Sequence, residues 1–446
     1  MNGCARSAPG SSGSRRNTGG YDHLHVKRLR LTQADVPETV RELRPSSERR
    51  EDVAAAVADI VEMVRNGGGD AVRRLTLRLD GVDVPDPRVP AHAIAAAVEG
   101  LAPVVREALE LLAANVRTVA SELVPRPTKV VLPQGQIVSS RPVPVRRAGV
   151  YVPGGLAAYP SSAVMGIVPA QVAGVPGIAV CSPPGPEGRP HATALAACGL
   201  LGVGEVYAVG GAQAVAALAL GTEGIPPVDL LVGPGNAYVE EAKRQMFGEI
   251  GIESLAGPSE LVVVADASAP VEPIAWDLLA QLEHGPGAQS VLVSTDAGLL
   301  DAVAAQLPAE SAAVLIEADS LDTAFAFVNA HGPEHVQLVI EGAEDAIGCV
   351  HHAGAIFVGP YAGTAFGDYI VGSNHILPTG GHSRFSSGLG PAAFLRTQEV
   401  VEVNAEACQR LADAVVVLAD AEGFPGHGRS ARVRAEALAR TPGRVG

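Results

Sequence analysis

The sequence of 446 residues predicts an α/β fold built from parallel sheets. Short runs rich in Val, Ile and Leu alternate with helical stretches from about residue 149 to residue 358, as in sheets whose parallel strands are connected by helices. Several of these runs carry no polar alternation, which is typical of strands covered on both faces. Because the runs are too many for one small sheet, we expect two tandem α/β domains of Rossmann-like build.

The expected elements follow one another in regular order after residue 149. The strands are expected at residues 149–152, 178–181, 205–209, 229–232, 261–265, 290–294, 313–316, 336–339 and 355–358. The helices between them are expected at residues 161–173, 191–200, 212–220, 273–282, 299–306 and 321–330.

Helices are also expected on both sides of this region. Apolar residues recur at helical spacing from Arg50 to Leu79, and the glycines at 67–69 divide that stretch into two helices. Residues 93–122 predict further helix. After about Arg384 the strand signal fades, and residues 406–421 predict one amphipathic helix followed by a turn.

Charge and cysteine content exclude several classes of protein. The chain has 33 Lys and Arg against 48 Asp and Glu, a net charge of −15, which leaves no basic face for phosphates and argues against a nucleic-acid partner. Its five cysteines are widely spaced and favour a reducing cytoplasm over a disulfide framework or a thiolate zinc site. Prolines and glycines interrupt the charge-free stretch between Arg147 and Glu187, so we expect no membrane association.

Three glycine-rich turns each follow an expected strand. They lie at 151–155, 210–213 and 233–236. Glycine lets backbone N–H groups approach a ligand, and a following helix N-terminus favours anions. None has the G-x-G-x-x-G spacing of a dinucleotide fingerprint, and each alone is also explained as a simple turn. Because the carboxyl ends of parallel strands share one sheet edge, we expect the three turns to converge on one ligand crevice.

Two polar clusters carry candidate chemistry. Gln281 and His284 are three residues apart at a helix end and share a face, where an imidazole with oxygen ligands suits zinc or a similar divalent metal. A capped, solvent-exposed helix end is the alternative interpretation. Glu334 and His335 are adjacent at the start of an expected strand, and both are candidate acid–base groups near neutral pH.

Two further polar pairs lie towards the C-terminus. Asp368 is followed by His375 seven residues on, and Glu422 is followed by His427. Ordinary surface polarity would also explain each pair.

Taken together, these motifs occur in the order and spacing of the histidinol dehydrogenase family, which the chain resembles over about residues 25–440. The matching stretches are Tyr151–Gly155, Gly210–Ala214, Gly233–Val239, Ala256–Glu260, Gln281–Gly285, Pro333–His335, Gly367–Tyr369 and Asn374–Thr379.

The resemblance implies an NAD-dependent, zinc-containing oxidoreductase of histidine biosynthesis. In that family L-histidinol is oxidised through histidinal to L-histidine in one site of a homodimer of intertwined subunits. The resemblance assigns one zinc per subunit to Gln281, His284, Asp368 and His427, the last supplied by the partner chain.

Further roles follow from the same resemblance. Glu334 and His335 match the catalytic acid–base pair and also contact substrate, as do the zinc ligands. The other substrate contacts are Ser259, His375 and Glu422. The NAD contacts are Tyr151, Gln213 and Asn236.

The family pattern also implies a division of the chain into five regions. A disordered tail at 1–20 is followed by a helical segment at 21–150 that joins the first α/β domain. The second α/β domain, at 151–258, binds NAD. The rest of the first domain, at 259–385, carries the zinc and catalytic residues, and a dimerisation extension follows at 386–446.

The chain departs from the family pattern at three positions. Gly363 and Thr364 stand about where many members have a proline and an acidic residue, and Glu253 stands where an aspartate is common. None of these is a proposed ligand or catalytic residue.

Two alternatives remain open at this point. One is a paralogous zinc- and NAD-dependent dehydrogenase of another small amino alcohol or of a sulfonated polyol. The chain retains four residues that suit an imidazole-bearing amine, which argues against this alternative: Ser259, His375, Glu422 and His427. The other is a non-enzymatic metal- or nucleotide-binding protein, against which the intact acid–base pair argues.

Overall fold

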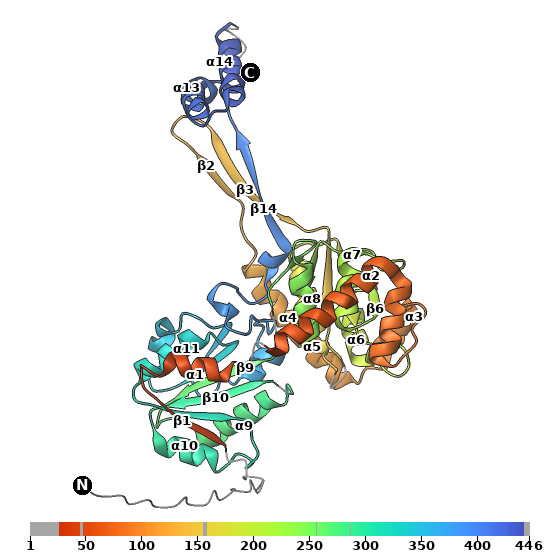
Figure 1. The fold of residues 1–446 in the computed structure, drawn as a ribbon, viewed down its shortest axis with the longest axis vertical. Coiled ribbons are helices and arrows are strands. Elements are labelled where there is room, and N and C mark those ends of the chain that lie inside the picture. The colour runs from red at the N-terminus through yellow and green to blue at the C-terminus, as the bar shows by residue number, and fades with distance from the viewer. Residues whose placement is uncertain (1–25, 45–47, 155–157, 256, 286, 441–446) are drawn as a thin grey trace, which may run out of the picture.

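The computed structural model describes residues 26–44, 48–154, 158–255, 257–285 and 287–440 (Figure 1). It confirms the expected mixed α/β fold with parallel sheets and many helices. The tail expected at 1–20 lies outside the described residues.

One sheet has six parallel strands in the order β1-β11-β10-β9-β12-β13. Alternate residues of its central strand pack in opposite directions, since Val262 and Val264 belong to one apolar core and Leu261 and Val263 to another. Helices therefore cover both faces, which explains the continuous apolar runs. The strands are β1 (Lys27–Leu31), β9 (Glu260–Ala265), β10 (Gln289–Ser294), β11 (Val314–Ala318), β12 (His335–Val339) and β13 (Ala355–Val358), and the helices are α1 (Val36–Leu43), α9 (Val271–Leu282), α10 (Ala297–Ala304) and α11 (Leu321–His331).

The second sheet has five parallel strands in the order β6-β5-β4-β7-β8. Helix α5 packs closely on it because Gly166 leaves no side chain between the helix and Val150 of β4. The strands are β4 (Arg147–Tyr151), β5 (Gly177–Ser182), β6 (Val206–Ala208), β7 (Leu230–Val232) and β8 (Gly251–Ile252), and the helices after them are α5 (Pro160–Val172), α6 (Ala192–Leu200), α7 (Gly211–Leu220) and α8 (Ala237–Met246).

The helices between residues 48 and 122 pack on helices α5 to α8 of the second sheet. Helix α2 (Glu48–Asp80) is divided by Gly68, whose φ of 51° and ψ of −139° break the helix where the glycine run predicts. The Glu223 carboxylate accepts a hydrogen bond of 2.9 Å from the backbone N–H of Gly69 and so holds this kink. The helix expected at 93–122 consists of two segments, α3 (Ala91–Glu99) and α4 (Pro103–Glu122), and a proline starts the second.

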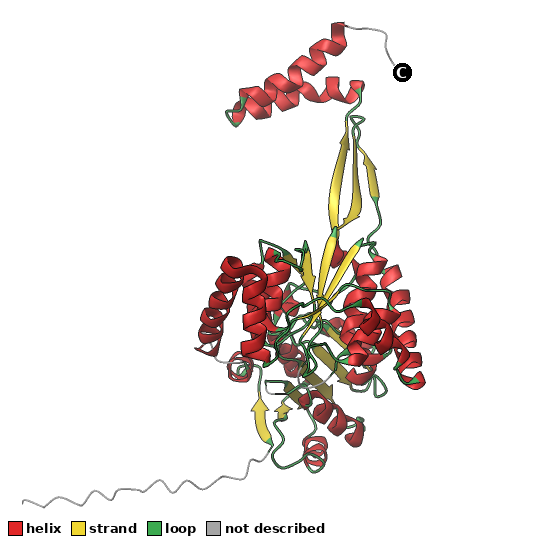
Figure 2. Ribbon diagram, turned by 90° about the vertical axis from the view of Figure 1, so that its right-hand side faces the viewer, coloured by secondary structure: helices red, strands yellow, loops and turns green. Residues whose placement is uncertain are grey.

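A three-stranded antiparallel sheet projects as an arm from the two α/β units (Figures 1 and 2). It consists of β2 (Thr128–Val131), β3 (Ile137–Pro144) and β14 (Leu395–Glu402), and it carries helices α13 (Ala405–Ala421) and α14 (Pro425–Arg440) at its far end. The expectations of helix up to residue 150 and of no strand after Arg384 are therefore wrong. The turn expected after residue 421 is present at 422–424, but a second helix, α14, follows it. The arm strands are largely exposed, so they lack the apolar run that marks a buried strand.

The described part of the chain contains no helix long and apolar enough to span a bilayer. The cysteines at 181, 198, 349 and 408 are free thiols.

Candidate functional site

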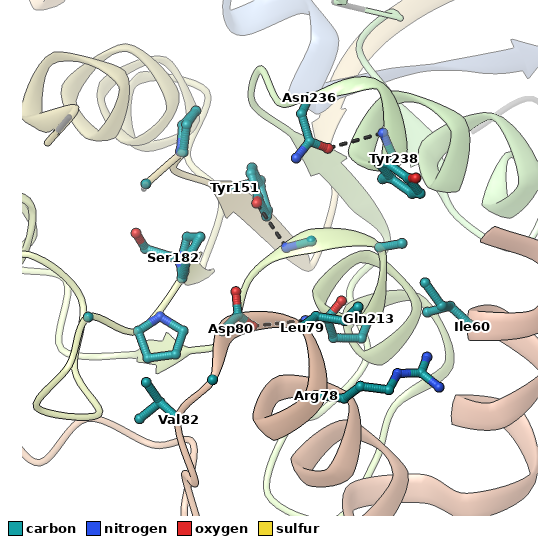
Figure 3. A pocket seen from close by; sticks show the side chains of 18 of the residues that line it. Ile60, Arg78, Leu79, Asp80, Val82, Tyr151, Ser182, Gln213, Asn236 and Tyr238 are labelled. Carbon is teal, nitrogen blue, oxygen red and sulfur yellow. Dashed lines mark hydrogen bonds between the residues drawn. The ribbon is translucent and has the colours of Figure 1, made fainter. Parts of the chain in front are cut away.

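The three glycine-rich turns meet at the carboxyl edge of the five-stranded sheet, around a cavity of about 1320 Å³ that we call the glycine pocket (Figure 3). Tyr151 ends β4, Gly211 and Gln213 begin α7 after β6, and Asn236 follows β7. The predicted convergence is thus present, and it follows from the parallel topology of the sheet.

Three polar side chains of the glycine pocket, those of Tyr151, Gln213 and Asn236, each have a defined hydrogen-bond partner. The Tyr151 hydroxyl accepts a hydrogen bond of 3.0 Å from the Gly211 N–H, and burial raises the pKa of that phenol. The Gln213 amide donates to the Asp80 carboxylate at 3.2 Å (Figure 3). Asn236 Oδ1 caps α8 by accepting from the N–H groups of Tyr238 and Val239 at 3.0 and 3.2 Å. The pocket is therefore preformed.

A second polar group lies at the amino edge of the six-stranded sheet. We call it the acid–base cluster, and its members are Ser259, Gln281, Glu334, His335 and Asp368. It forms because β9 and β12 are parallel neighbours, so that the residues that begin them, Ser259 with Glu260 and Glu334 with His335, lie side by side.

Glu334 is fixed by its surroundings on one of its two oxygens. Its Oε2 accepts from the Ser259 hydroxyl at 2.5 Å and from the Glu260 N–H at 3.0 Å. Gln281, at the end of α9, donates its Nε2 to the same serine oxygen at 2.9 Å. Among the described residues, these hydrogen bonds leave Oε1 of Glu334 unpaired, so Oε1 is the oxygen available for chemistry.

His335 is buried between two carboxylates. Its Nδ1 lies 3.2 Å from the Glu260 carbonyl oxygen and 3.4 Å from Glu334 Oε2, and its Nε2 lies 3.6 Å from Asp368 Oδ1. Burial lowers the pKa of His335, but the charge of Glu334 and the contact with Asp368 outweigh it and raise that pKa to about 10.

Asp368 and His375 connect this cluster to the other sheet. Asp368 lies on α12 (Thr364–Tyr369), and its carbonyl oxygen pairs with His375 Nδ1 at 2.8 Å. The other nitrogen of His375 lies 3.2 Å from the Ser162 hydroxyl on α5, a helix that begins just after Gly154 and Ala158 of the glycine pocket. The two sites are therefore neighbours.

His284 also lies near the cluster. Burial raises the pKa of Asp368, yet contact with His335 and the charges of His375 and His284 outweigh it and lower that pKa. Gly367 lets α12 approach because a Cβ there would collide with the Phe357 ring on β13.

Two of the sequence-predicted residues lie elsewhere in the chain. Glu422 ends α13 and His427 lies in α14, both at the far end of the arm (Figure 1), and the His427 ring packs against Phe424 with 5.6 Å between the ring centroids. Within the described ranges, no group of three or more His, Cys, Asp or Glu residues is arranged to hold a metal ion. One chain alone therefore does not assemble the four expected zinc ligands.

Sequence reasoning missed two acidic residues at these sites. Asp80 ends α2 and reaches Gln213, 133 positions away in sequence, so no local pattern could reveal it. Glu260 lies within a matched motif, but its burial was not foreseen. Its Oε1 accepts from the Gly380 N–H at 3.1 Å, and burial together with the charge of Glu334 raises its pKa to about 8.

This buried carboxyl predicts a pH dependence of stability. Between its ordinary pKa of 4.5 and about 8, the folded protein keeps a proton on Glu260 that the unfolded chain has released, so stability falls as pH rises. Glu260→Gln, whose carbonyl still accepts from Gly380, is expected to raise Tm relative to wild type at pH 9 and to have little effect at pH 4.5. Thermal melts at both pH values check this. An equal Tm difference at the two values would contradict it.

The chain is a parallel α/β protein in which a preformed glycine pocket lies beside a buried carboxylate–imidazole pair. This is the architecture of an enzyme that uses acid–base chemistry. Residues 43–435 match the family profile described as histidinol dehydrogenase. The chain belongs to the histidinol dehydrogenase family.

Individual relatives are similar over most of their length. Histidinol dehydrogenase of Leifsonia xyli subsp. xyli is 45% identical over 410 residues, which cover 86% of this chain and 94% of the relative. That of Nocardia farcinica is 44% identical over 444 residues, 93% of this chain and all of the relative. The crystal structure of histidinol dehydrogenase from Elizabethkingia anophelis has a TM-score of 0.88 at 30% identity and covers 94% of this chain and 100% of that structure.

Proposed function

We propose that this protein oxidises L-histidinol through histidinal to L-histidine with NAD as the hydride acceptor. Membership of the family supports this activity. The observation that carries it is the acid–base cluster, in which Glu334 keeps one oxygen free and lies beside a buried imidazole, next to the glycine pocket.

NAD occupies the glycine pocket in this proposal. Tyr151, Gln213 and Asn236 are its polar contacts, and each is already oriented by the hydrogen bonds described above. The Gly211 and Asn236 turns present helix N-termini, which suit the negative pyrophosphate. NAD supplies the hydride chemistry, and the protein supplies position and proton transfer.

One zinc ion per subunit is proposed at Gln281, His284 and Asp368 with His427 of the partner subunit. The donors fit, because amide, imidazole and carboxylate groups are zinc ligands and Gln281 Nε2 is engaged by Ser259, which leaves Oε1 for a cation. Such an ion supplies Lewis-acid orientation of the substrate's imidazole and amine, and it neutralises the Asp368 charge that favours protonated His335.

The proton steps fall to Glu334 and His335. In the first oxidation a hydride leaves the carbinol carbon for NAD, and the hydroxyl proton passes to His335. Water then adds to the aldehyde as Glu334 Oε1 takes one of its protons and protonated His335 gives its proton to the carbonyl oxygen, which gives the hydrate and returns His335 to its neutral form. A second hydride leaves the same carbon for a second NAD while His335 again accepts the hydroxyl proton, and the carboxylic acid results. Ser259, His375 and Glu422 of the partner subunit bind the substrate.

We further propose that the active unit is an intertwined homodimer of tandem Rossmann-like domains divided as the family pattern implies. The arm strands and helices α13 and α14 carry exposed apolar side chains that a partner subunit would bury. Glu422 lies in the turn after α13, and His427 lies on α14. Exposed apolar clusters of this kind mark protein interfaces.

Substrate specificity tests this proposal most simply. NADH formation is expected with L-histidinol and not with other small amino alcohols or sulfonated polyols at the same concentration. Turnover of one of those compounds in preference to L-histidinol would identify the alternative dehydrogenase.

Metal removal tests the zinc site. Metal analysis is expected to find about one zinc per chain, as one set of four ligands implies. His284→Ala is expected to lose metal and activity together while its far-UV circular dichroism stays that of wild type, because the α/β cores do not depend on the metal. Full activity after exhaustive chelation would contradict the proposal.

A further inference from the structure

A buried ion pair lies behind the third glycine-rich turn of the pocket. Lys243 Nζ and Glu253 Oε1 are 2.7 Å apart, and their side chains are only 1% and 2% exposed. Both groups also bind the backbone of Gly233, the residue that opens the turn. Its N–H donates to Glu253 Oε1 at 2.8 Å, and its carbonyl accepts from Lys243 Nζ at 3.2 Å.

The turn itself has little freedom once Gly233 is held. Gly233 has a φ of 121°, and a Cβ there would overlap the carbonyl oxygen of Tyr151, so the turn lies directly on the end of β4. At its other end Asn236 caps α8, the helix that carries Lys243. The ion pair, the turn and α8 therefore form one closed unit that includes Asn236 and lies against Tyr151, two of the proposed NAD contacts.

The stability of the fold does not by itself explain why a buried ion pair lies at this position. Removing two charges from water is costly, and a well-packed apolar pair often stabilises a fold as well or better. Here Glu253 Oε2 is also buried, and none of the described residues gives it a hydrogen bond. Unlike an apolar pair, this ion pair supplies a hydrogen-bond acceptor for the Gly233 N–H and a donor for the Gly233 carbonyl.

Glu253 also links the pocket to the acid–base cluster along the chain. It follows β8 directly, and Ser259, which holds Glu334, lies six residues further on. The carboxylate that holds the cofactor turn is thus on the segment that enters the catalytic site.

We propose that Lys243 and Glu253 are positioning residues for the nicotinamide dinucleotide, acting through the Gly233–Asn236 turn. The pair holds this turn so that Asn236 and Tyr151 meet the cofactor in one fixed geometry. This inference rests on the proposed NAD dependence.

The test separates positioning from stability by replacing both charges together. Either single apolar variant leaves an uncompensated buried charge, so the main variant is Lys243→Met with Glu253→Met. We expect its Tm to remain close to that of wild type. We expect its Kd for NADH, from fluorescence titration, and its KM for NAD to rise about tenfold or more, as loss of two hydrogen bonds to the turn implies. The KM for L-histidinol is expected to change little.

A matched control uses a second ion pair on the same helix, in which the Arg244 side chain is exposed. Arg244 and Glu241 are bonded to each other on α8, and Arg244→Met with Glu241→Gln is expected to leave the NADH Kd at the wild-type value. Glu253→Gln keeps an acceptor for the Gly233 N–H, so it is expected to lose less NADH affinity than the double variant. If the double variant does not fold, the single variants Glu253→Gln and Lys243→Arg test the positioning role instead. Both keep a hydrogen-bond partner for Gly233, so both are expected to bind NADH more tightly than Glu253→Met does.

The outcomes distinguish this inference from the proposed function. A folded double variant that binds NADH as tightly as wild type would overturn the positioning role, and so would Glu253→Met binding as tightly as Glu253→Gln. Failure of the wild-type protein to bind NADH would instead overturn the NAD dependence, and the positioning role with it.

Discussion

Glu334→Gln is expected to slow the conversion of histidinal to histidine by about 10²–10⁴-fold, the usual contribution of a general base, and to slow histidinol oxidation far less. The amide keeps the shape of the side chain and can still accept from Ser259 and the Glu260 N–H, as Glu334 Oε2 does. It cannot take a proton from water, so the hydration step between the two hydride transfers loses its base.

Single-turnover NADH formation from alcohol and from aldehyde measures the two steps separately. His335→Asn serves as the comparison, because each hydride transfer needs a proton acceptor, and this variant is expected to slow both steps. The two groups are only 3.4 Å apart, so a pH profile of the reaction cannot be assigned to one of them alone. Equal slowing of both steps by Glu334→Gln would reject the water-activation role and leave Glu334 as an electrostatic partner of His335.

Hybrid dimers are expected to recover the formation of histidine from histidinol, which both parent variants lose. In the proposed dimer, His427→Ala would damage only the site of the partner subunit, whereas Glu334→Gln would damage the site of its own chain. A dimer of one chain of each kind therefore has one site with both defects and one intact site. The physical reason is the position of His427 on α14, at the far end of the arm from the acid–base cluster of the same chain.

Co-refolding of two differently tagged variants and tandem purification isolates the hybrid. Its activity per dimer is expected to approach half that of wild type, and each parent homodimer provides the background. A verified hybrid no more active than its parents would contradict the shared site.

The central strands could be predicted because the apolar sequence pattern that marks a buried strand is local to the strand. Strands β9 and β12 are buried on both faces, so their composition alone marks them, and the parallel arrangement that follows brings Ser259 and Glu334 together. The kink at Gly68 was likewise predictable, since only glycine readily adopts its backbone conformation.

Features that depend on distant contacts were not predictable. The exposed arm strand β14 pairs with β3 more than 200 positions earlier in the chain and has no buried face to mark it. Strand β1 is an edge strand with mostly exposed residues, and its partner β11 lies far along the chain. The contacts of Asp80 and the burial of Glu260 and Lys243 likewise arise only when remote segments pack together.

The stoichiometry of complete turnover tests the central claim most directly. A limiting amount of L-histidinol is incubated with excess NAD until NADH stops increasing, and the product is identified by mass. The account predicts two NADH per L-histidinol and L-histidine as the product. One NADH per substrate with histidinal accumulating, or no NADH with L-histidinol at all, would contradict it.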